Sequence, residues 1–594
     1  MSGTAFTDAA LAVQARPPAR ALATGVSTDA SALVAFAGTA TLMLVAPFER
    51  LQPLIRLPAQ SISNLEAAIA AAILAWGALL LWTRGAALRS TPVTAPWLVW
   101  IVVMIGSALA APAWRTNALH MAGRLTAAFF VFLLAAHGVT SRARLIGAAA
   151  AALTAGVAVS VLVVLEFFTV PSVLVWLKAF RPQVMTVGAL VRAGGTLQYP
   201  TIASMYLEIV FALGVGLLLT AARAKRAGSA AVVFASLLLV AYAITLTFTR
   251  SGIILMAVTL AWCGALRVGR GRFDSGSAIL VLLAASVAAV FLSSRSLDSI
   301  RLRFTSEGQE LWYSARVVAP PTVTLATGAS TAVPVTITNT GRLDWSSQSD
   351  APFFLSYHWM LPDTDQYVVF DGVRTPFDAP VSAGDVVSMR PIVRAPRHPG
   401  QYRLVWDIVQ EHRTWFTDEP GAVRTITQAA VEGAPIGGPL QAFGRPRPAW
   451  RPQRLTLWRA AVRLFAEHPL FGIGPDNFRL MYAPYAGLPT GDARIHSNDM
   501  YLEVLVGGGV AGACAFVWLL WAAARMCAAG VAAGDRHQVP LAIGIAAAGL
   551  AMLVHGLVDA FLEFAPTYTM FSLTLGLAAA CARGVETGAD AHCV

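Results

Sequence analysis

The sequence predicts an all-α polytopic membrane protein of about 12 transmembrane helices with an inserted β-sandwich domain. Three observations support this fold class. Of the 594 residues, 56% are hydrophobic and only 13% are charged, whereas a soluble protein carries about 25% charged residues. About twelve apolar segments are long enough to cross a bilayer. One long polar segment, residues 315–430, instead alternates apolar and polar residues as strands do.

The chain begins with residues 1–29, which are rich in Ala, Ser, Thr and Pro and lack the regions of a signal peptide. We expect a flexible cytoplasmic tail there, nine transmembrane helices within 30–293, three more within 499–582, and a second cytoplasmic tail at 583–594. The predicted spans are roughly 30–47, 64–83, 95–112, 123–139, 145–169, 202–221, 229–249, 251–268, 277–293, 499–526, 539–558 and 565–582.

The distribution of basic residues predicts the orientation in the membrane. Arg and Lys gather in every second loop, for example at Arg142 and Arg144 and again at Arg223 and Lys225. Such loops are cytoplasmic by the positive-inside rule, so the loops that hold 170–201 and 294–498 lie outside. The net charge of +11 therefore reflects membrane topology and does not indicate a nucleic-acid partner.

Residues 315–430 are predicted to form a periplasmic β-sandwich behind a connector at 294–314. Apolar residues alternate with polar ones from Val333 to Ile337 and from Tyr402 to Ile408, with turns at Asn339-Thr340-Gly341 and Ala383-Gly384-Asp385. The five cysteines all lie in or beside apolar segments, so this domain has no disulfide. Asp363-Thr364-Asp365 matches the Asp-x-Asp of some metal-dependent transferases, but its position after Pro362 favours a solvated turn.

Residues 431–498 are predicted to hold a Pro/Gly linker and a periplasmic amphipathic helix. Leu455, Trp458, Val462 and Phe465 recur at helical spacing, and Arg459 lies on another face. Such a helix suits the outer membrane surface, and packing against the transmembrane bundle is an equal alternative.

Three arginines and one histidine are the candidate site residues. Arg494 and His496 stand where a polar segment enters an apolar, Gly-rich helix, Arg250 stands at the outer end of a helix, and Arg192 lies in an outer loop. The predicted topology places all four on one face of the membrane. Charged groups at that depth are costly unless they are paired or functional, although a simple interfacial anchor is the alternative.

Three patches around these residues resemble the signature regions of the O-antigen ligase/polymerase superfamily. They are RAGGTLQYPTIASMYLE, TFTRSGIILMAVTLA and the series HPLFGIGPDNF…RIHSNDMYLEVLVGGGVAG. The resemblance covers roughly 30–310 and 450–582. Many members read His-x-His-Asn where this chain has Ile495-His496-Ser497-Asn498, so the matching histidine can shift by one position. The β-rich insertion lies outside the common family core and resembles immunoglobulin-like modules of other bacterial envelope proteins.

The resemblance implies a metal-independent, inverting glycosyltransferase in the bacterial inner membrane. Such enzymes need no cofactor and move a glycan from undecaprenyl pyrophosphate to a lipid or glycan acceptor on the periplasmic face. Arg192 and Arg250 match family arginines near the donor phosphates, and His496 matches the loop histidine. Arginine binds phosphate oxygens with a planar fork, and histidine accepts a hydroxyl proton near neutral pH.

Arg494 and three further residues, Asn498, Arg459 and Glu503, are assigned to substrate binding. Glu503 is expected either to orient His496 or to pair with an arginine. Membrane lipids and envelope polysaccharide assembly proteins are the other expected partners.

The sequence does not choose among a ligase onto lipid A core, a polymerase of repeat units and a transferase onto protein. A transporter or flippase of polyisoprenoid-linked sugars is the alternative from another class, with Glu166 and Glu208 as its acidic candidates. A β-domain receptor on a membrane anchor is a third alternative, but it would not need about twelve spans.

Overall fold

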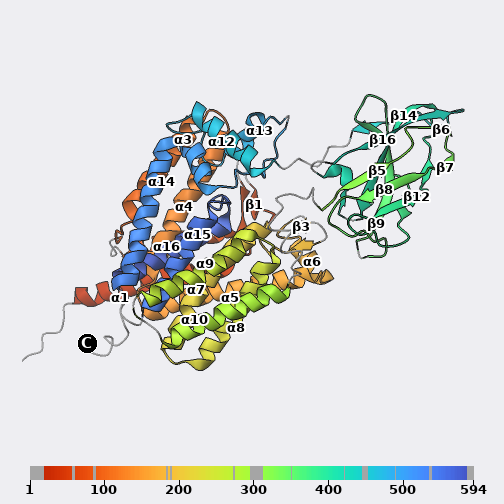
Figure 1. Ribbon diagram of the computed structural model, residues 1–594. Helices are drawn as coiled ribbons and strands as arrows, with labels where there is room; N and C mark the ends of the chain where they lie inside the picture. Colours follow the sequence, from red (N-terminus) through yellow and green to blue (C-terminus); the bar gives the residue numbers. More distant parts are fainter. Residues whose placement is uncertain are drawn as a thin grey trace, which may run out of the picture.

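A computed structural model shows a helical bundle joined to a separate group of strands (Figure 1). The described residues are 19–56, 61–83, 88–181, 185–187, 190–269, 271, 274–294, 312–349, 351–411, 413–419, 422–444, 452–488, 490–533 and 538–584. Most of the predicted connector at 294–314, most of the tail at 583–594 and residues 1–18 lie outside the described residues.

Each of the predicted apolar segments forms a helix. These helices are α1 (Ala19–Val45), α2 (Asn64–Thr83), α3 (Thr94–Ala110), α4 (Arg115–Gly138), α5 (Arg142–Phe167), α7 (Pro200–Arg223), α8 (Ala227–Leu246), α9 (Arg250–Val268), α10 (Ser275–Ser294), α14 (Met500–Ala533), α15 (Val539–His555) and α16 (Ala565–Arg583). Within the described ranges, 8 helices are long and apolar enough to cross a membrane, and Ala30–Val45, α3 and α15 are shorter apolar helices. The chain is thus a multi-pass membrane protein, and the number of about twelve spans stays a prediction.

The tail predicted for 1–29 needs a correction, because α1 already begins at Ala19. Residues 19–29 contain neither proline nor a cluster of charges, and alanine has the highest helix propensity, so the helix extends beyond the apolar segment.

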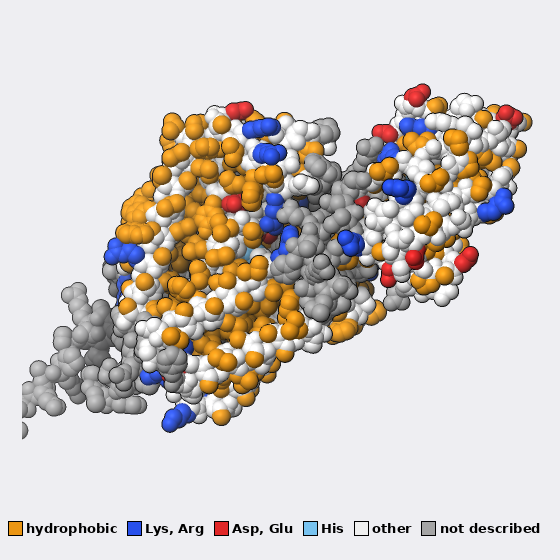
Figure 2. Space-filling view, viewed as in Figure 1, with side chains coloured by type: hydrophobic (Ala, Val, Ile, Leu, Met, Phe, Trp, Pro, Cys, Tyr) orange, Lys and Arg blue, Asp and Glu red, His pale blue; other side chains and the backbone are white. Residues whose placement is uncertain are grey.

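Helix α7 lies at the centre of the bundle and is buried along its whole membrane-spanning window. It packs against α15, α8 and α5. A Cβ added at Gly216 of α7 would lie 3.2 Å from the Gly544 Cα of α15. Small residues allow this close approach of two membrane helices, which makes α7 and α15 a tightly packed pair. By contrast, hydrophobic side chains cover most of the visible outer face of the bundle (Figure 2).

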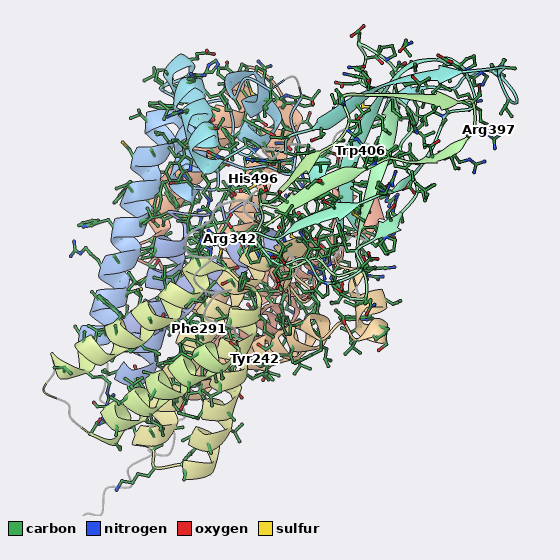
Figure 3. The ribbon with its side chains drawn as sticks, turned by 45° about the vertical axis from the view of Figure 1, so that its right-hand side comes forward. Tyr242, Phe291, Arg342, Arg397, Trp406 and His496 are labelled. Atoms are coloured by element: carbon green, nitrogen blue, oxygen red, sulfur yellow. The ribbon has the colours of Figure 1, made fainter. Side chains whose placement is uncertain are left out.

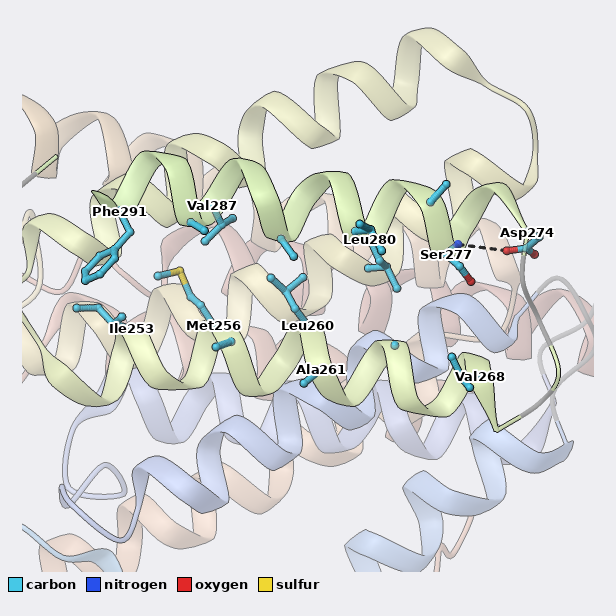
Figure 4. A pocket seen from close by; sticks show the side chains of 16 residues that line it. Ile253, Met256, Leu260, Ala261, Val268, Asp274, Ser277, Leu280, Val287 and Phe291 are labelled. Atoms are coloured by element: carbon cyan, nitrogen blue, oxygen red, sulfur yellow. Dashed lines mark hydrogen bonds between the residues drawn. The ribbon is translucent and has the colours of Figure 1, made fainter. Parts of the chain in front are cut away.

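Helices α9 and α10 lie at the edge of the bundle and are separated by an apolar groove of about 770 Å³. Its lining runs from Ile253 and Phe291 at one end to Val268 and Asp274 at the other (Figure 4). Only a third or less of each helix is buried inside the protein, so α9 has few packing partners to fix its position.

Helix α14 contains a break at Gly507-Gly508-Gly509, where Gly509 has φ 62°. The segment that follows Pro469 supplies the missing backbone partners. The Val506 and Gly507 carbonyls accept the N–H groups of residues 473 and 474 at 2.9 and 3.0 Å, and the Val510 N–H donates to the Pro469 carbonyl at 2.8 Å. A broken membrane helix requires such compensation, because lipid offers no hydrogen bonds. The polar segment that precedes α14 is thereby fixed on the bundle.

Within the part of the chain that the structure describes, the short helical elements outside the apolar helices are α6 (Pro171–Leu177), α12 (Arg454–Glu467), α13 (Phe478–Tyr485) and the 3-10 turn η1 (Phe416–Asp418). The amphipathic helix predicted around residues 455–465 is α12. Its buried residues Leu457, Ala460, Ala461 and Leu464 pack with Phe478 and Tyr482 of α13 and with Val506 of α14. The alternative of packing against the bundle therefore holds for this face.

Two β-hairpins lie in the loops of the bundle: β1 (Ile55–Arg56) with β2 (Ser61–Ile62), and β3 (Met185–Val187) with β4 (Leu190–Arg192). The separate group contains β5 (Ala315–Val318), β6 (Thr322–Ala326), β7 (Ser330–Ala332), β8 (Val335–Asn339), β9 (Phe353–Met360), β10 (Gln366–Val369), β11 (Thr375–Pro376), β12 (Val386–Met389), β13 (Ile392–Arg394), β14 (Gly400–Gln410), β15 (Thr414–Trp415), β16 (Thr425–Glu432) and β17 (Phe443–Gly444).

The strand group, residues 315–432 with β17, forms where the alternation predicted strands. The largest sheet has the order β17-β10-β9-β14-β16-β6, a second sheet has the order β12-β8-β5, and β13 pairs with β7. All these pairs are antiparallel except β16 with β6. Trp345, Trp359 and Trp406 are fully buried in one shared core. Asp363-Thr364-Asp365 lies in the turn between β9 and β10, and its likeness to an Asp-x-Asp motif is incidental. The immunoglobulin-like assignment stays a resemblance.

Candidate active site

The first signature patch meets the second through Arg192. Its Nε donates to the Thr247 carbonyl at 3.2 Å, and its Nη2 donates to Thr249 Oγ1 at 3.3 Å. Thr247 and Thr249 form the junction between α8 and α9, and Arg250 is the first residue of α9. The two arginines predicted to bind donor phosphates therefore lie at the same helix junction, although they are far apart in the sequence.

A buried carboxylate fixes the loop that carries Arg192. Glu166 Oε2 of α5 accepts the N–H groups of Gly194 at 3.0 Å and Gly195 at 2.8 Å. Glu166 also forms an ion pair with Arg181, and both side chains are almost completely buried. Gly195 has φ +56°, a conformation that glycine adopts without strain. Glu166 is thus occupied in shaping the loop.

The first patch meets the third through aromatic rings. Tyr199, which immediately precedes α7, contacts Phe564 with ring centroids 6.1 Å apart, and His496 contacts the same ring at 5.6 Å. His496 lies at the end of the bundle below α12 and α13 (Figure 3). All three patches therefore converge on one end of the bundle.

His496 is paired with Glu503, one of the two roles considered for this carboxylate. The His496 Nδ1 lies 3.6 Å from Glu503 Oε1, and the same oxygen accepts the Ser497 N–H at 2.6 Å. Glu503 is buried in the first turn of α14, where an acidic side chain also stabilises the helix N-terminus. Asp499 caps this helix by accepting the Leu502 N–H at 2.9 Å. The Trp458 indole of α12 donates to the Ser497 carbonyl at 3.1 Å, and this bond fixes the His496 loop to α12.

The carboxylates around His496 change its acidity. Burial alone would lower the pKa of His496, but Glu503, followed by Glu563 and Asp476, raises it to about 9. The ordinary value is about 6.5. The imidazole is therefore mainly protonated at neutral pH, and it is a stronger base when neutral than the sequence alone suggested.

Glu563 is a site residue that the sequence analysis missed. It precedes Phe564 in the turn between α15 and α16, and its Oε2 has no hydrogen-bond partner among the described residues. Burial, followed by the like charge of Glu503, raises the pKa of Glu563 to about 8. A signal was present in the sequence, since an acidic residue between two apolar helices is rare, but nothing in the sequence linked it to His496.

A second missed group connects the site to α4. Arg479 of α13 pairs with Asp476 at 2.7 Å and donates to Asn117 Oδ1 of α4 at 2.7 Å. Asn117 in turn donates to Asn477 Oδ1 at 3.0 Å. Asp476 and Asn477 belong to the HPLFGIGPDNF series and Arg479 directly follows it, so these bonds to Asn117 fix the series on the bundle. Their partners lie about 360 positions away, a distance that no local pattern bridges.

Not all of the residues predicted to bind substrate lie buried beside His496. Arg494 is 63% exposed and forms an ion pair with Asp492 at 2.7 Å, so a phosphate would compete with that carboxylate. Arg459 is exposed on α12. Asn498 directly precedes the helix cap and has φ 56°, a conformation that asparagine tolerates better than most residues. Arg250 is partly exposed and has neither an ion pair nor a hydrogen bond among the described residues.

A further chain of polar groups crosses the bundle beside Arg250. Ser251 Oγ lies 3.2 Å from His555 Nε2, and His555 Nδ1 lies 2.8 Å from Glu208 Oε2. Among the described residues there is no group of three His, Cys, Asp or Glu side chains arranged to hold a metal ion.

Comparison with known protein families gives a match over part of the chain. Residues 421–517 match the family model described as O-Antigen ligase. The matched region runs from the last strands through α12, α13 and the His496 loop into α14. No curated protein matches the sequence. The family match supports the resemblance to the O-antigen ligase/polymerase superfamily, and it does not extend that support to an immunoglobulin-like insertion.

Proposed function

We propose that this chain, a member of the O-antigen ligase/polymerase superfamily, transfers a glycan from undecaprenyl pyrophosphate to an acceptor on the periplasmic face of the bacterial inner membrane. The observation that carries the proposal is the convergence of the Arg192–Arg250 junction with the His496–Glu503 pair at one end of the bundle. The two groups of residues supply the two things that the reaction needs.

The arginines serve the leaving group. Pyrophosphate departs with negative charge that must be stabilised in the transition state. Arg250 has a charged fork that no carboxylate among the described residues neutralises, and Arg192 stands beside it across Thr247 and Thr249. A guanidinium binds two phosphate oxygens at once, which an ammonium cannot do.

The His496–Glu503 pair serves the acceptor. In its neutral form, His496 takes the proton from the acceptor hydroxyl, and Glu503 stabilises the imidazolium that forms. The hydroxyl oxygen attacks the anomeric carbon as the bond to the pyrophosphate oxygen breaks, so the configuration inverts. A positioned base contributes about 10²–10⁴-fold in rate. No metal ion takes part in this proposal.

The transporter alternative receives less support. Its acidic candidates are both engaged within the fold, since Glu166 accepts two backbone N–H groups and Glu208 pairs with His555. Both carboxylates are therefore engaged with groups of the fold and are not available to bind a substrate on a path through the membrane. We further propose that the strand group positions the acceptor or a partner protein.

The test uses purified protein with lipid-linked donor and acceptor, with and without EDTA. We expect His496→Ala to lower transfer by about 10²–10⁴-fold at normal protein abundance. Arg250→Ala and Arg192→Ala should weaken donor binding, and lysine should restore it only partly. Near wild-type transfer by His496→Ala would remove the base from the mechanism, and loss of transfer in EDTA would point to a metal site.

A lipid analysis of a deletion strain separates the subclasses. Accumulation of long glycan on the lipid carrier indicates a ligase, and accumulation of single repeats indicates a polymerase. Reporter fusions test the orientation: a fusion near Ala430 should report the periplasm, and a fusion near Arg226 should report the cytoplasm.

A further inference from the structure

The polar chain beside Arg250 links three helices. Ser251 belongs to the first turn of α9, His555 is the last residue of α15, and Glu208 lies on α7. The distances are 3.2 Å from Ser251 Oγ to His555 Nε2 and 2.8 Å from His555 Nδ1 to Glu208 Oε2. Ser204 Oγ donates to the second oxygen of Glu208 at 2.8 Å. His555 and Glu208 are 1% and 2% exposed.

The donor and acceptor pattern gives the chain a direction. A carboxylate only accepts hydrogen bonds, so the His555 Nδ1–H donates to Glu208. In the neutral tautomer that this bond selects, Nε2 is an acceptor, and the Ser251 hydroxyl donates to it. Each ring nitrogen of His555 and each oxygen of Glu208 then has a hydrogen-bond partner. Buried polar groups within a membrane bundle are expensive unless they are paired in this way or serve a function.

A close approach of backbone and side chain marks the same place. A Cβ added at Gly252 would lie 2.0 Å from Ser204 Oγ and 3.1 Å from Glu208 Oε1. The first turn of α9 therefore lies directly against the polar groups of α7, and only glycine fits at this position. This observation is independent of the hydrogen bonds, and it fixes the same helical turn.

Arg250 stands between two sets of contacts. Arg192 holds the residues just before it, Thr247 and Thr249, and the Ser251–His555–Glu208 chain holds the residue just after it. The rest of α9 lies at the edge of the bundle, with only 33% of its window buried. In contrast, α7 and α15 form the packed centre. The polar chain thus connects the first turn of α9, a helix at the edge of the bundle, to the packed centre formed by α7 and α15.

We infer that Ser251, His555 and Glu208 are positioning residues that hold Arg250 in place for the donor pyrophosphate. The inference rests on the proposed function, because Arg250 is the group through which the three residues act. They themselves touch neither the donor nor the acceptor. Removing the chain leaves the charge of Arg250 intact but lets the first turn of α9 move, so donor affinity falls.

The experiment measures binding of radiolabelled farnesyl pyrophosphate to the purified full-length protein, with thermal melting of each variant. We expect Ser251→Ala to weaken binding about 3- to 10-fold, the usual weight of one hydrogen bond, and Ser251→Thr to restore it. The matched control is Ser160→Ala. Ser160 is fully buried in α5, and among the described residues its hydroxyl bonds only the Gly156 carbonyl of its own helix, at 2.7 Å. This control should bind like wild type.

A double-mutant cycle separates positioning from general destabilisation. In an Arg250→Lys background, which already lacks the fork, Ser251→Ala should cause no further loss of affinity. An equal loss in both backgrounds, or an unchanged affinity of Ser251→Ala at normal melting temperature, would overturn the inference. Should Ser251→Ala fail to fold, His555→Gln carries the same cycle. If wild type itself does not bind farnesyl pyrophosphate, the proposed function fails, which is a different result from a normal wild type with an indifferent Ser251→Ala.

Discussion

At the scale of single residues, the environment of His496 determines what this imidazole can do. Glu503 lies 3.6 Å away, Phe564 packs against the ring, and Glu563 directly precedes Phe564 in the same turn. The result is a histidine whose proton is held more tightly than usual. This raised pKa makes a base role and a cation role distinguishable by experiment.

The first prediction concerns the pH dependence of transfer. A base must be neutral to act, and the pKa of His496 is raised to about 9, so kcat/KM should rise with pH from about 6 to 9 and then level off. Glu503→Gln removes the charge that raises the pKa of His496 most, while burial still lowers this pKa. The plateau of kcat/KM should therefore begin at lower pH. The maximal rate should fall as well, because the base is weaker. A wild-type rate that falls on approach to pH 9 would assign His496 the role of a phosphate-binding cation.

The second prediction concerns Glu563 and stability. Its folded pKa is raised to about 8 from an ordinary value near 4.5, so the folded state binds the proton more tightly than the unfolded state. The contribution of Glu563 to the free energy of unfolding is therefore present below about pH 4.5 and lost as pH rises towards 8. Glu563→Gln keeps the neutral shape. Its melting temperature should exceed that of wild type at pH 8.5 much more than at pH 5.5. Equal differences at both pH values would contradict the assignment.

At the scale of elements, the break in α14 illustrates how two parts of the third signature patch form one local structure. The Gly-rich stretch and the series around Pro469 were both recognised in the sequence as parts of that patch, but nothing in the sequence showed that they contact each other. The structure joins them through hydrogen bonds between residues 473 and 506 and between residues 510 and 469. The length of the apolar segments was enough to predict the long apolar helices. By contrast, α13 and the break in α14 depend on tertiary partners that no local sequence pattern contains.

The third prediction tests this break. Gly509 has φ 62°, and an added Cβ would lie 2.4 Å from the Leu470 carbonyl oxygen. Gly509→Ala should therefore destabilise the protein by more than about 1 kcal/mol and displace the His496 loop. The control is Gly549→Ala in the middle of α15, where nothing lies within 4 Å of the added Cβ. Alanine at 549 should be neutral or slightly stabilising, since it favours helix over glycine. Thermal melting and transfer activity measure both effects. Equal melting temperatures for the two variants would argue against the close packing of the segment around Pro469 on the break in α14.

At the scale of the whole molecule, the shared face of the candidate residues followed from counting basic loops. The counting predicted that Arg192, Arg250 and His496 lie on one face of the membrane. The contacts through Thr249 and Phe564 bring their three patches together, and the shared membrane face stays a prediction. The count of basic loops could not predict how these three residues are arranged around the site. That arrangement depends on α15 and α16, whose connecting turn carries Glu563 and Phe564 and contributed no residue to the sequence-based site.

Among the described residues, Phe248 links the strand group to the bundle. Phe248, at the junction before Arg250, is 3% exposed and belongs to the same cluster of buried side chains as Trp312, Tyr313 and the strand core. It also has φ 55°, an uncommon conformation for an aromatic residue. The junction that carries Arg250 is therefore packed from the bundle side by Arg192 and from the strand side by this cluster.

The fourth prediction is that residues 312–444 fold without the membrane part. Their core contains three fully buried tryptophans, and their strands form continuous ladders, with β14 paired along its length to β9 and β16. Phe248 is the one member of this cluster from outside the fragment among the described residues, so its loss should cost little of the core. The isolated fragment should show a strand-type circular dichroism spectrum and a cooperative melt under reducing conditions and in EDTA. Trp406→Ala should abolish the melt, because a large cavity in a core costs about 3–5 kcal/mol. An unfolded spectrum for the wild-type fragment would mean that the bundle is required to complete the sheets, and that the strand group is an extension of the site rather than a domain beside it.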